Sequence, residues 1–459
     1  MYNYFSQLLY IMSDFDDIYG KYILDVPGTT IDIKDLNYAL KNNKDYTENI
    51  KQNWGINTKI PNIEPDNKRA LYLYHPNYNQ QVTELKQFRE QNPSGGGFTI
   101  FLEEINQTNN NVYIRSKILY HYKKNKIKYV VIFGSVEEVA TIMIDLPSDW
   151  ESRGTLNNND VNAASDMYYG HMDNKEYKII IGRLSPGDNK YGVSYNELSI
   201  SQKQTNIQNQ VDKIKTYEEL CTTLSQEISL PSQYNWIKNI VGIASNEGDG
   251  YGFEGKSDNV YMRGELKNYS SELNCSCTEL YQGSLALPSN RNTQYDYDDA
   301  GNPTITNLTT SINNGTSLLL YVGHANEITL STTGISVRNV TNISPVKKYF
   351  LGCVVGCSIG SHDERFMSLA EEFQVSKDKG SIAMFASSIL QSWTAPMYMQ
   401  SQLNSTIINA TKTLTIGEIF QKSVENSDFK NNVDYYYYQL LGDPCTRFIL
   451  TIPDVKSKF

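Results

Sequence analysis

The feature that most constrains this chain is the alternation of short apolar runs with longer stretches of helical spacing. Compact runs rich in β-branched and aromatic residues, such as KYVVIFG (128–134), are typical of buried strands. Stretches such as QTNIQNQVDKIKTYEEL (204–220) predict helices. Because strands that alternate with helices form βαβ units, the pattern predicts an α/β fold with mainly parallel sheets flanked by helices.

The expected elements fall into two runs separated by a polar joint near 225–235. Strands are expected at 70–75, 98–105, 128–134, 177–183, 238–245, 316–323, 348–356 and 381–388. Helices are expected at 82–91, 112–125, 204–220, 258–273, 367–374 and 404–414. We therefore expect two α/β lobes, 69–225 and 235–453, with the second carrying the chemistry. Residues 1–68 are polar and weakly periodic, and are interpreted as an N-terminal extension.

Composition narrows the class of protein. The 459 residues carry 39% hydrophobic and 20% charged side chains, as expected for a globular chain. The net charge of −10 argues against a nucleic-acid partner and against anionic membrane surfaces. No run approaches the roughly 20 apolar residues of a membrane span. The N-terminus lacks the basic start of a signal peptide, which favours an intracellular location.

Only five histidines and six cysteines are available for imidazole or thiol chemistry. The cysteines form neither a disulfide framework nor the paired CxxC arms of a structural zinc site. In open α/β sheets, ligands bind beyond the carboxyl ends of strands. Glu247, His324 and Cys353 each fall at such an end in the second lobe.

These three groups suit nucleophilic catalysis by a thiol. A cysteine nucleophile needs a base nearby, and a histidine serves as that base and later protonates the leaving amine. A carboxylate on the other ring nitrogen orients the imidazole. Gly323 and Gly352 could present backbone N–H groups to an oxyanion. Each residue also has an ordinary interpretation: Cys353 as core packing, His324 as a structural group, and Glu247 as a solvated or cation-binding carboxylate.

The same residues resemble the gingipain family of cysteine peptidases, in the caspase and legumain-like group. The resemblance covers about residues 70–450 and rests on an ordered set of short segments. They are KYVVIFGSVEEV (128–139), SDMYYGHMD (165–173), IIIGRLS (179–185), NQVDKIKTYE (209–218), IASNEG (243–248), YVGHANE (321–327), GCVVG (352–356), SSILQSWTAPM (387–397) and LGDP (441–444).

The resemblance implies a caspase–hemoglobinase-like fold and an endopeptidase with a Cys–His dyad assisted by a glutamate. Cys353 would be the nucleophile, His324 the general base and acid, and Glu247 the residue that orients His324. Asp258 falls where arginine-specific members place the carboxylate of the S1 pocket, which implies a preference for arginine at P1. Ser257–Asp258 is also a good N-cap for the following helix.

The resemblance extends to other contacts with the substrate. Trp393 and Met397 fall where the family frames the P1 side chain. The turn around Gly323 and Ala325, together with Gly352, would line the substrate and the oxyanion.

Some positions depart from the family pattern. Ala325 replaces the glycine after the catalytic histidine, where a positive φ would be strained. Val355 replaces an asparagine. Cys357 stands four residues after Cys353, which makes it the alternative nucleophile or a partner that could oxidise with Cys353.

The resemblance implies a protein or peptide substrate and no cofactor for catalysis. It leaves room for a structural calcium ion, to which the acidic loops 165–173 and 247–254 could supply oxygen ligands. Three other functions stay open. They are an inactive scaffold of the same fold, a transpeptidase that uses the same thioester, and a binding module that uses tyrosines such as Tyr435–Tyr438.

Overall fold

The computed structural model describes ten stretches of the chain. They are residues 63–106, 111–145, 162–171, 177–188, 197–227, 229–282, 303–344, 346–363, 366–431 and 433–457. Most of the expected N-terminal extension, 1–68, lies outside the described residues.

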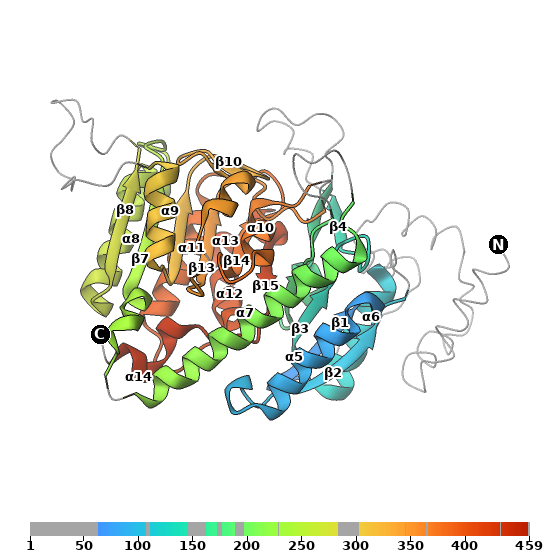
Figure 1. The fold of residues 1–459 in the computed structure, drawn as a ribbon. Coiled ribbons are helices and arrows are strands. Elements are labelled where there is room, and N and C mark those ends of the chain that lie inside the picture. Colours follow the sequence, from blue (N-terminus) through green and yellow to red (C-terminus); the bar gives the residue numbers. More distant parts are fainter. Residues whose placement is uncertain are drawn as a thin grey trace, which may run out of the picture.

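A ten-stranded sheet forms the centre of the molecule, in the order β2-β1-β3-β6-β15-β14-β13-β9-β7-β8 (Figure 1). Its strands are β1 (Asp66–Tyr74), β2 (Thr99–Glu104), β3 (Ile127–Phe133), β6 (Ile180–Leu184), β7 (Asn239–Ala244), β8 (Ser276–Tyr281), β9 (Leu318–Val322), β13 (Phe350–Val355), β14 (Ser381–Ser387) and β15 (Tyr438–Gly442). Two small sheets are added, β4 (Ile142–Asp145) with β5 (Asn162–Ser165), and β10 (Ala325–Asn326) with β11 (Thr329–Leu330) and β12 (Ile335–Ser336).

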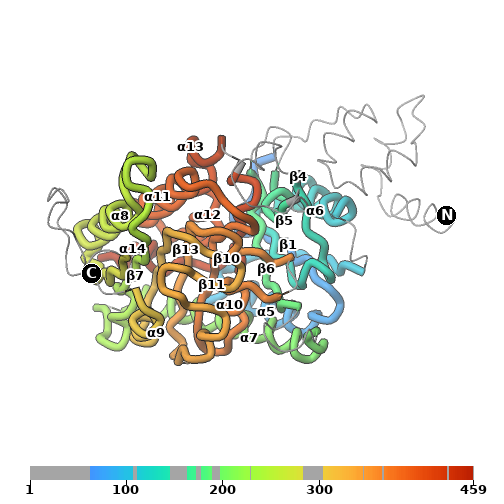
Figure 2. The backbone as a smooth tube through the Cα atoms, turned by 90° about the horizontal axis from the view of Figure 1, so that it is seen from above, coloured from blue at the N-terminus to red at the C-terminus, as the bar shows by residue number. Residues whose placement is uncertain are grey.

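Helices cover both faces of the large sheet. Figure 2 shows α5 (Asn79–Gln91), α7 (Ile200–Gln226), α9 (Ile305–Asn314) and α10 (Leu369–Val375) on one side. The other side carries α6 (Asn111–Asn125), α8 (Asp258–Leu273), α11 (Ala395–Ile408) and α12 (Ile416–Val424). The short helices α13 (Ser427–Lys430) and α14 (Pro453–Lys456) complete the set. This arrangement confirms the α/β class and the flanking helices.

Most of the expected elements form within a few residues of their predicted ends. The helix expected at 404–414 instead begins at Ala395 and ends at Ile408. Pro396 occupies its first turn, where a proline's missing N–H costs no helical hydrogen bond. Strands β8 and β15 and helices α9 and α12 form in addition to the elements expected from the sequence.

The expected separation into two lobes is not what the sheet shows. Strands β2, β1, β3 and β6 pair in parallel, as do β14, β13, β9, β7 and β8. β15 joins these groups, because it pairs antiparallel with β14 and contacts β6 through Leu441 and Arg183. The strands of the two expected lobes thus share one continuous sheet. The proposed boundaries 69–225 and 235–453 stay a prediction.

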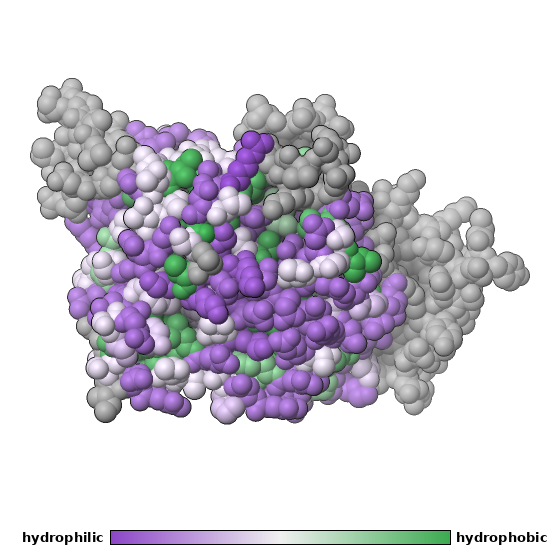
Figure 3. All heavy atoms as spheres, in the orientation of Figure 1, coloured by the Kyte–Doolittle hydropathy of each residue, from purple (hydrophilic) through white to green (hydrophobic). Residues whose placement is uncertain are grey.

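Side chains alternate between the two faces of the central strands, as the pleat requires. Leu351, Cys353 and Val355 of β13 pack into the core on the side of α11 and α12. Phe350 and Val354 pack into the core on the side of α9 and α10. Outward-facing residues of α5 and α7 make much of the visible face hydrophilic (Figure 3). None of the helices in the described ranges is both long and apolar enough to cross a bilayer.

A buried arginine connects the two halves of the chain. Arg89 of α5 is fully buried, and its guanidinium donates to Glu218 Oε1 of α7 at 2.6 Å and to Asp443 Oδ2 after β15 at 2.6 Å. Thr446 Oγ1 accepts a further bond from Arg89 at 2.9 Å. Three segments far apart in sequence therefore meet at one cation.

Replacing this cation should destabilise the fold. Arg89→Met leaves the Asp443 carboxylate buried without its counter-ion, and we expect the free energy of unfolding to fall by about 3 kcal/mol. Urea denaturation measures the loss. The control is Lys86→Met, which removes the partly exposed pair with Glu90 on the same helix and should cost less than about 1 kcal/mol. Equal losses in the two variants would contradict this account of Arg89.

Candidate active site

An imidazole and a carboxylate meet beyond the carboxyl ends of two neighbouring strands. His324 follows β9, and Glu247 follows β7, which pairs in parallel with β9. Glu247 Oε2 accepts a hydrogen bond from His324 Nε2 at 3.0 Å. The side chains are 59% and 44% exposed, respectively, so a ligand can reach them. The bond to Nε2 leaves Nδ1 as the ring nitrogen that can exchange a proton with a reacting group.

Two hydrogen bonds to the His324 carbonyl hold the backbone here. The buried Tyr321 hydroxyl donates to the His324 carbonyl at 2.5 Å, and Ser331 N–H donates to the same oxygen at 3.0 Å. Gly323 takes φ = 152°, and a Cβ there would lie 2.8 Å from Thr332 Oγ1. The positive φ of this turn therefore falls on Gly323, whereas Ala325 belongs to β10. The substitution at 325 is accommodated without the strain that the sequence analysis considered.

A second carboxylate lies beside this pair. Asp258 is the first residue of α8 and is fully buried. Its oxygens accept bonds from Ser245 Oγ at 2.6 Å and Trp393 Nε1 at 3.1 Å. The Ser257 side chain makes no capping bond, and Asp258 N–H donates to the Glu247 carbonyl, which closes the loop between the two acids.

Burial raises the pKa of Asp258 to about 6, and the nearby Glu247 charge contributes in the same direction. The bonds from Ser245 and Trp393 lower it, as does His324, but they do not cancel the cost of burial. Asp258 is thus a carboxylate that gains or loses its charge near neutral pH and gains stability from a cation beside it.

Aromatic side chains cover the two acids and the histidine. The Trp393 ring meets the His324 ring edge-on, with centroids 5.3 Å apart. The Tyr251 side chain, which is 64% exposed, packs edge-on against Trp393, with ring centroids 5.9 Å apart. A Cβ at Gly248 would lie 2.9 Å from Trp393 Nε1, so only glycine allows the loop to approach this closely. Glu247, Asp258, His324 and Trp393 are therefore brought together as expected.

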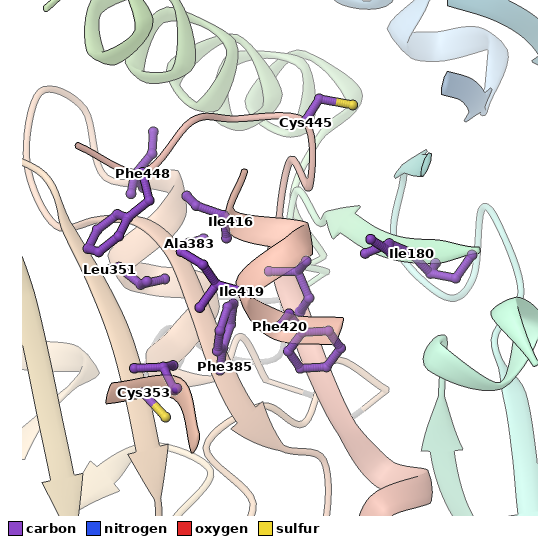
Figure 4. Packing of buried hydrophobic residues seen from close by; sticks show 14 of the residues in the cluster. Ile180, Leu351, Cys353, Ala383, Phe385, Ile416, Ile419, Phe420, Cys445 and Phe448 are labelled. Atoms are coloured by element: carbon purple, nitrogen blue, oxygen red, sulfur yellow. The ribbon is translucent and has the colours of Figure 1, made fainter. Parts of the chain in front are cut away.

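Cys353 lies elsewhere. It is fully buried in the middle of β13, among Leu351, Phe385 and other apolar side chains (Figure 4). Burial raises the pKa of its thiol to about 12. Its Cα is paired with Leu320 of β9, four residues before His324, which at about 3.3 Å per residue is about 13 Å along the strand. This position fits the packing role of Cys353 and does not fit the expected role of nucleophile.

Cys357 occupies the position that Cys353 was expected to hold. The register between β9 and β13 ends at Val322 and Val355, and His324 and Cys357 each follow two residues later. The two turns are in contact, because a Cβ on Gly356 would lie 2.9 Å from Ala325 Cβ and 3.2 Å from the Gly323 carbonyl. Cys357 is only partly buried. It therefore stands at the same edge of the sheet as His324.

The surroundings of Cys357 keep its thiol neutral at rest. Burial raises the pKa of Cys357, and Asp434 and Glu327 raise it further. The backbone N–H of Gln391 donates to the sulfur and acts in the opposite direction. A thiol in this state needs a base to become a nucleophile.

Other predicted site residues lie away from solvent. Met397 is fully buried in α11, and Gly352 is paired with Leu319 and Met384 inside the sheet. A contact of Met397 with substrate stays a prediction, whereas the backbone of Gly352 is committed to the sheet. Three of the tyrosines 435–438 are buried, which contradicts a tyrosine patch on the surface.

The calcium interpretation has no direct support in the structure. Asp166, in one of the two acidic loops, has both oxygens engaged by Arg183 at 2.5 and 2.7 Å. Among the residues that the structure describes, no three His, Cys, Asp or Glu side chains gather as a metal site. A structural calcium ion stays a prediction.

Several residues of this site were not expected from the sequence. Ser245 and Tyr251 had no pattern to mark them, although both flank the predicted Glu247. The choice of cysteine failed for a clearer reason. The pattern Gly-Cys-x-x-Gly occurs twice, as GCVVG (352–356) and GCSIG (356–360), and the two copies share Gly356.

The sequence matches a family of peptidases and individual peptidases that are similar to one another. The model of peptidase family C25 matches residues 63–449. Gingipain R2 of Porphyromonas gingivalis is 26% identical over 251 residues, which are 50% of this chain and 30% of that protein. Gingipain R1 of the same species is 26% identical over 251 residues, 22% of its length. The match thus spans less than a third of either relative.

Solved structures share the fold. The crystal structure of the Arg-specific cysteine proteinase gingipain R superposes with a TM-score of 0.64 at 19% identity, covering 85% of this chain and 80% of that one. A complex of the pro- and mature domains of RgpB from P. gingivalis gives 0.62 at 18% identity, with 82% and 79% coverage.

The difference in burial predicts which cysteine reacts. Iodoacetamide should modify Cys357 in the folded protein at least tenfold faster than Cys353, because only Cys357 is open to solvent. Fragment-ion mass spectrometry distinguishes the two sites, and in denaturant both should react alike. Faster modification of Cys353 in the folded protein would contradict the described positions.

Proposed function

Because the chain belongs to peptidase family C25, we propose that it is a cysteine endopeptidase in which Cys357 is the nucleophile, His324 the general base and acid, and Glu247 the residue that orients His324. The observation that carries this proposal is the common register of His324 and Cys357 beyond the paired ends of β9 and β13. Cys357 thereby replaces Cys353 in the role expected from the sequence.

The reaction follows from these positions. His324 Nδ1 removes the thiol proton as the Cys357 sulfur attacks the peptide carbonyl, and the charged imidazolium is stabilised by Glu247. The backbone N–H groups of Cys357 and of the turn at 323–325 would stabilise the oxyanion. His324 then protonates the leaving amine, and water hydrolyses the thioester. The raised pKa of the Cys357 thiol makes this base essential at neutral pH.

The second part of the proposal is a preference for arginine at P1. Asp258 supplies a buried carboxylate beside the dyad, and Trp393 supplies an aromatic surface for a planar cation. One similar protein, gingipain R, is described as an Arg-specific cysteine proteinase. The positive charge of a guanidinium would also offset the free-energy cost of burying the charged Asp258 carboxylate, whereas a neutral side chain would not.

The nucleophile is tested by substitution. Cys357→Ala should lower kcat/KM on an arginyl peptide by about 10⁴-fold or more, because the covalent step is lost. Cys353→Ala is the matched control, four residues away in the same strand region, and should retain kcat/KM within a few fold after correction for the folded fraction. Activity that persists in Cys357→Ala and disappears in folded Cys353→Ala would refute the assignment.

The S1 assignment is tested by pH. The Asp258 carboxyl is protonated below its pKa of about 6, so its attraction for a guanidinium should be present above pH 6 and lost as the pH falls. The ratio of kcat/KM for an arginyl substrate to that for its neutral citrulline analogue should fall at least tenfold from pH 7.5 to 5. This ratio cancels titrations of the dyad.

The control for that experiment is Asp258→Asn, which preserves the shape of the side chain. In this variant the arginine-to-citrulline ratio should be about 10- to 100-fold lower at pH 7.5 and independent of pH, since one charge-assisted pair is lost. A ratio unchanged by the substitution would remove Asp258 from the S1 assignment and leave the dyad untouched.

A further inference from the structure

One short segment, residues 391–393, contacts Cys357, His324 and Asp258. Gln391 N–H donates to the Cys357 sulfur. Two residues later, Trp393 donates to Asp258 and packs against the His324 ring. Residues 391–393 have no helical or strand structure, so no helical or sheet ladder of hydrogen bonds holds them. Their position must be set from outside the segment.

A buried carboxylate supplies this outside support. Asp434 is fully buried and lies in the short 3-10 helix Val433–Tyr437, just before β15. Ser392 N–H donates to Asp434 Oδ1 at 2.8 Å, and the Ser392 hydroxyl donates to Oδ2. The Tyr437 hydroxyl also donates to Oδ1, at 3.0 Å. The two bonds from Ser392 therefore fix the position of the residue between Gln391 and Trp393.

A tyrosine adds a second attachment. The Tyr438 hydroxyl bonds to Gln391 Oε1 at 2.7 Å and to the Val354 carbonyl of β13 at 3.0 Å. Through Tyr438 the segment is thus tied to β13, the strand that precedes Cys357. Through Asp434 it is tied to the short 3-10 helix before β15. The bond from Tyr438 holds a side chain, whereas the bonds to Asp434 hold backbone and side chain together.

We propose that Asp434 is a positioning residue of the peptidase site. Its two hydrogen bonds with Ser392 hold Gln391 against the nucleophile and Trp393 against His324 and Asp258. This inference rests on the proposed role of Cys357. Asp434 touches no reacting atom, and its effect passes through the segment 391–393. The charge of Asp434 has a second effect, because it raises the pKa of the Cys357 thiol while the Gln391 N–H that it positions lowers it.

These two effects can be separated, because two substitutions change them differently. Asp434→Asn removes the charge, yet its oxygen can still accept from Ser392 N–H and Tyr437, and its amide can donate to the Ser392 hydroxyl. Ser392→Ala keeps the charge and loosens the segment. The rate of Cys357 alkylation by iodoacetamide against pH should therefore shift to lower pH in Asp434→Asn and to higher pH in Ser392→Ala.

Kinetics on the arginyl peptide provide the second measurement. Ser392→Ala should raise KM and lower kcat, with a combined loss of about tenfold in kcat/KM, whereas Asp434→Asn should stay within about threefold of the wild type. The matched control is Tyr437→Phe, which removes one hydrogen bond to the same carboxylate but leaves both Ser392 bonds in place, and should change neither the alkylation profile nor kcat/KM.

Opposite shifts of the alkylation profile support the proposal. Unchanged profiles in both variants, or a shift to lower pH in Ser392→Ala, would overturn it. Alkylation of Cys357 requires no peptidase activity. A failure of the proposed function, seen as full activity in Cys357→Ala, is therefore distinguishable from a failure of the role given to Asp434.

Discussion

The parallel register between β9 and β13 is the constraint on which the candidate site depends. It aligns Val322 with Val355, so that the residues that follow, Gly323 with His324 and Gly356 with Cys357, leave the sheet side by side. Close contact between the two turns requires a glycine at 356, since a Cβ there would strike Ala325. β7, paired on the other edge of β9, delivers Glu247 to the same place. Three chemical groups far apart in sequence thus depend on backbone pairing for their proximity.

Charge burial is arranged differently at the centre of the fold and at its edge. Arg89, Glu218 and Asp443 are buried together, and each charge has a partner, which holds α5, α7 and the C-terminal loop in one unit. Asp258 has hydrogen bonds, but among the described residues no lysine or arginine forms an ion pair with it, and burial raises its pKa. A buried carboxyl group with a raised pKa marks a candidate functional position more often than a purely structural one.

Local patterns and the family resemblance were sufficient to predict the α/β class, most strands and four of the residues that meet at the site, Glu247, Asp258, His324 and Trp393. They could not predict that β15 would join the strands of both expected lobes into one sheet, because that pairing links residues such as Arg183 and Leu441, which have no local signal in common. Asp434 was missed for the same reason: within VDYYYY it resembles an acidic residue of a surface loop, and its bonds to Ser392 form only when the chain is folded.

The choice between the two cysteines shows the limit most clearly. Cys353 and Cys357 lie four residues apart in overlapping Gly-Cys-x-x-Gly runs, and an even spacing preserves the side of the sheet on which a strand residue points. The periodicity of the sequence therefore cannot show which cysteine lies at the site. That depends on the residue at which the strand ends, and β13 ends at Val355, between the two. That end is set by tertiary contacts, because Ser358 takes φ = 59° and donates its N–H to the Ile389 carbonyl, which turns the chain away from the sheet. Cys353 remains inside as a packing residue, and Cys357 is placed at the turn, where it is partly exposed.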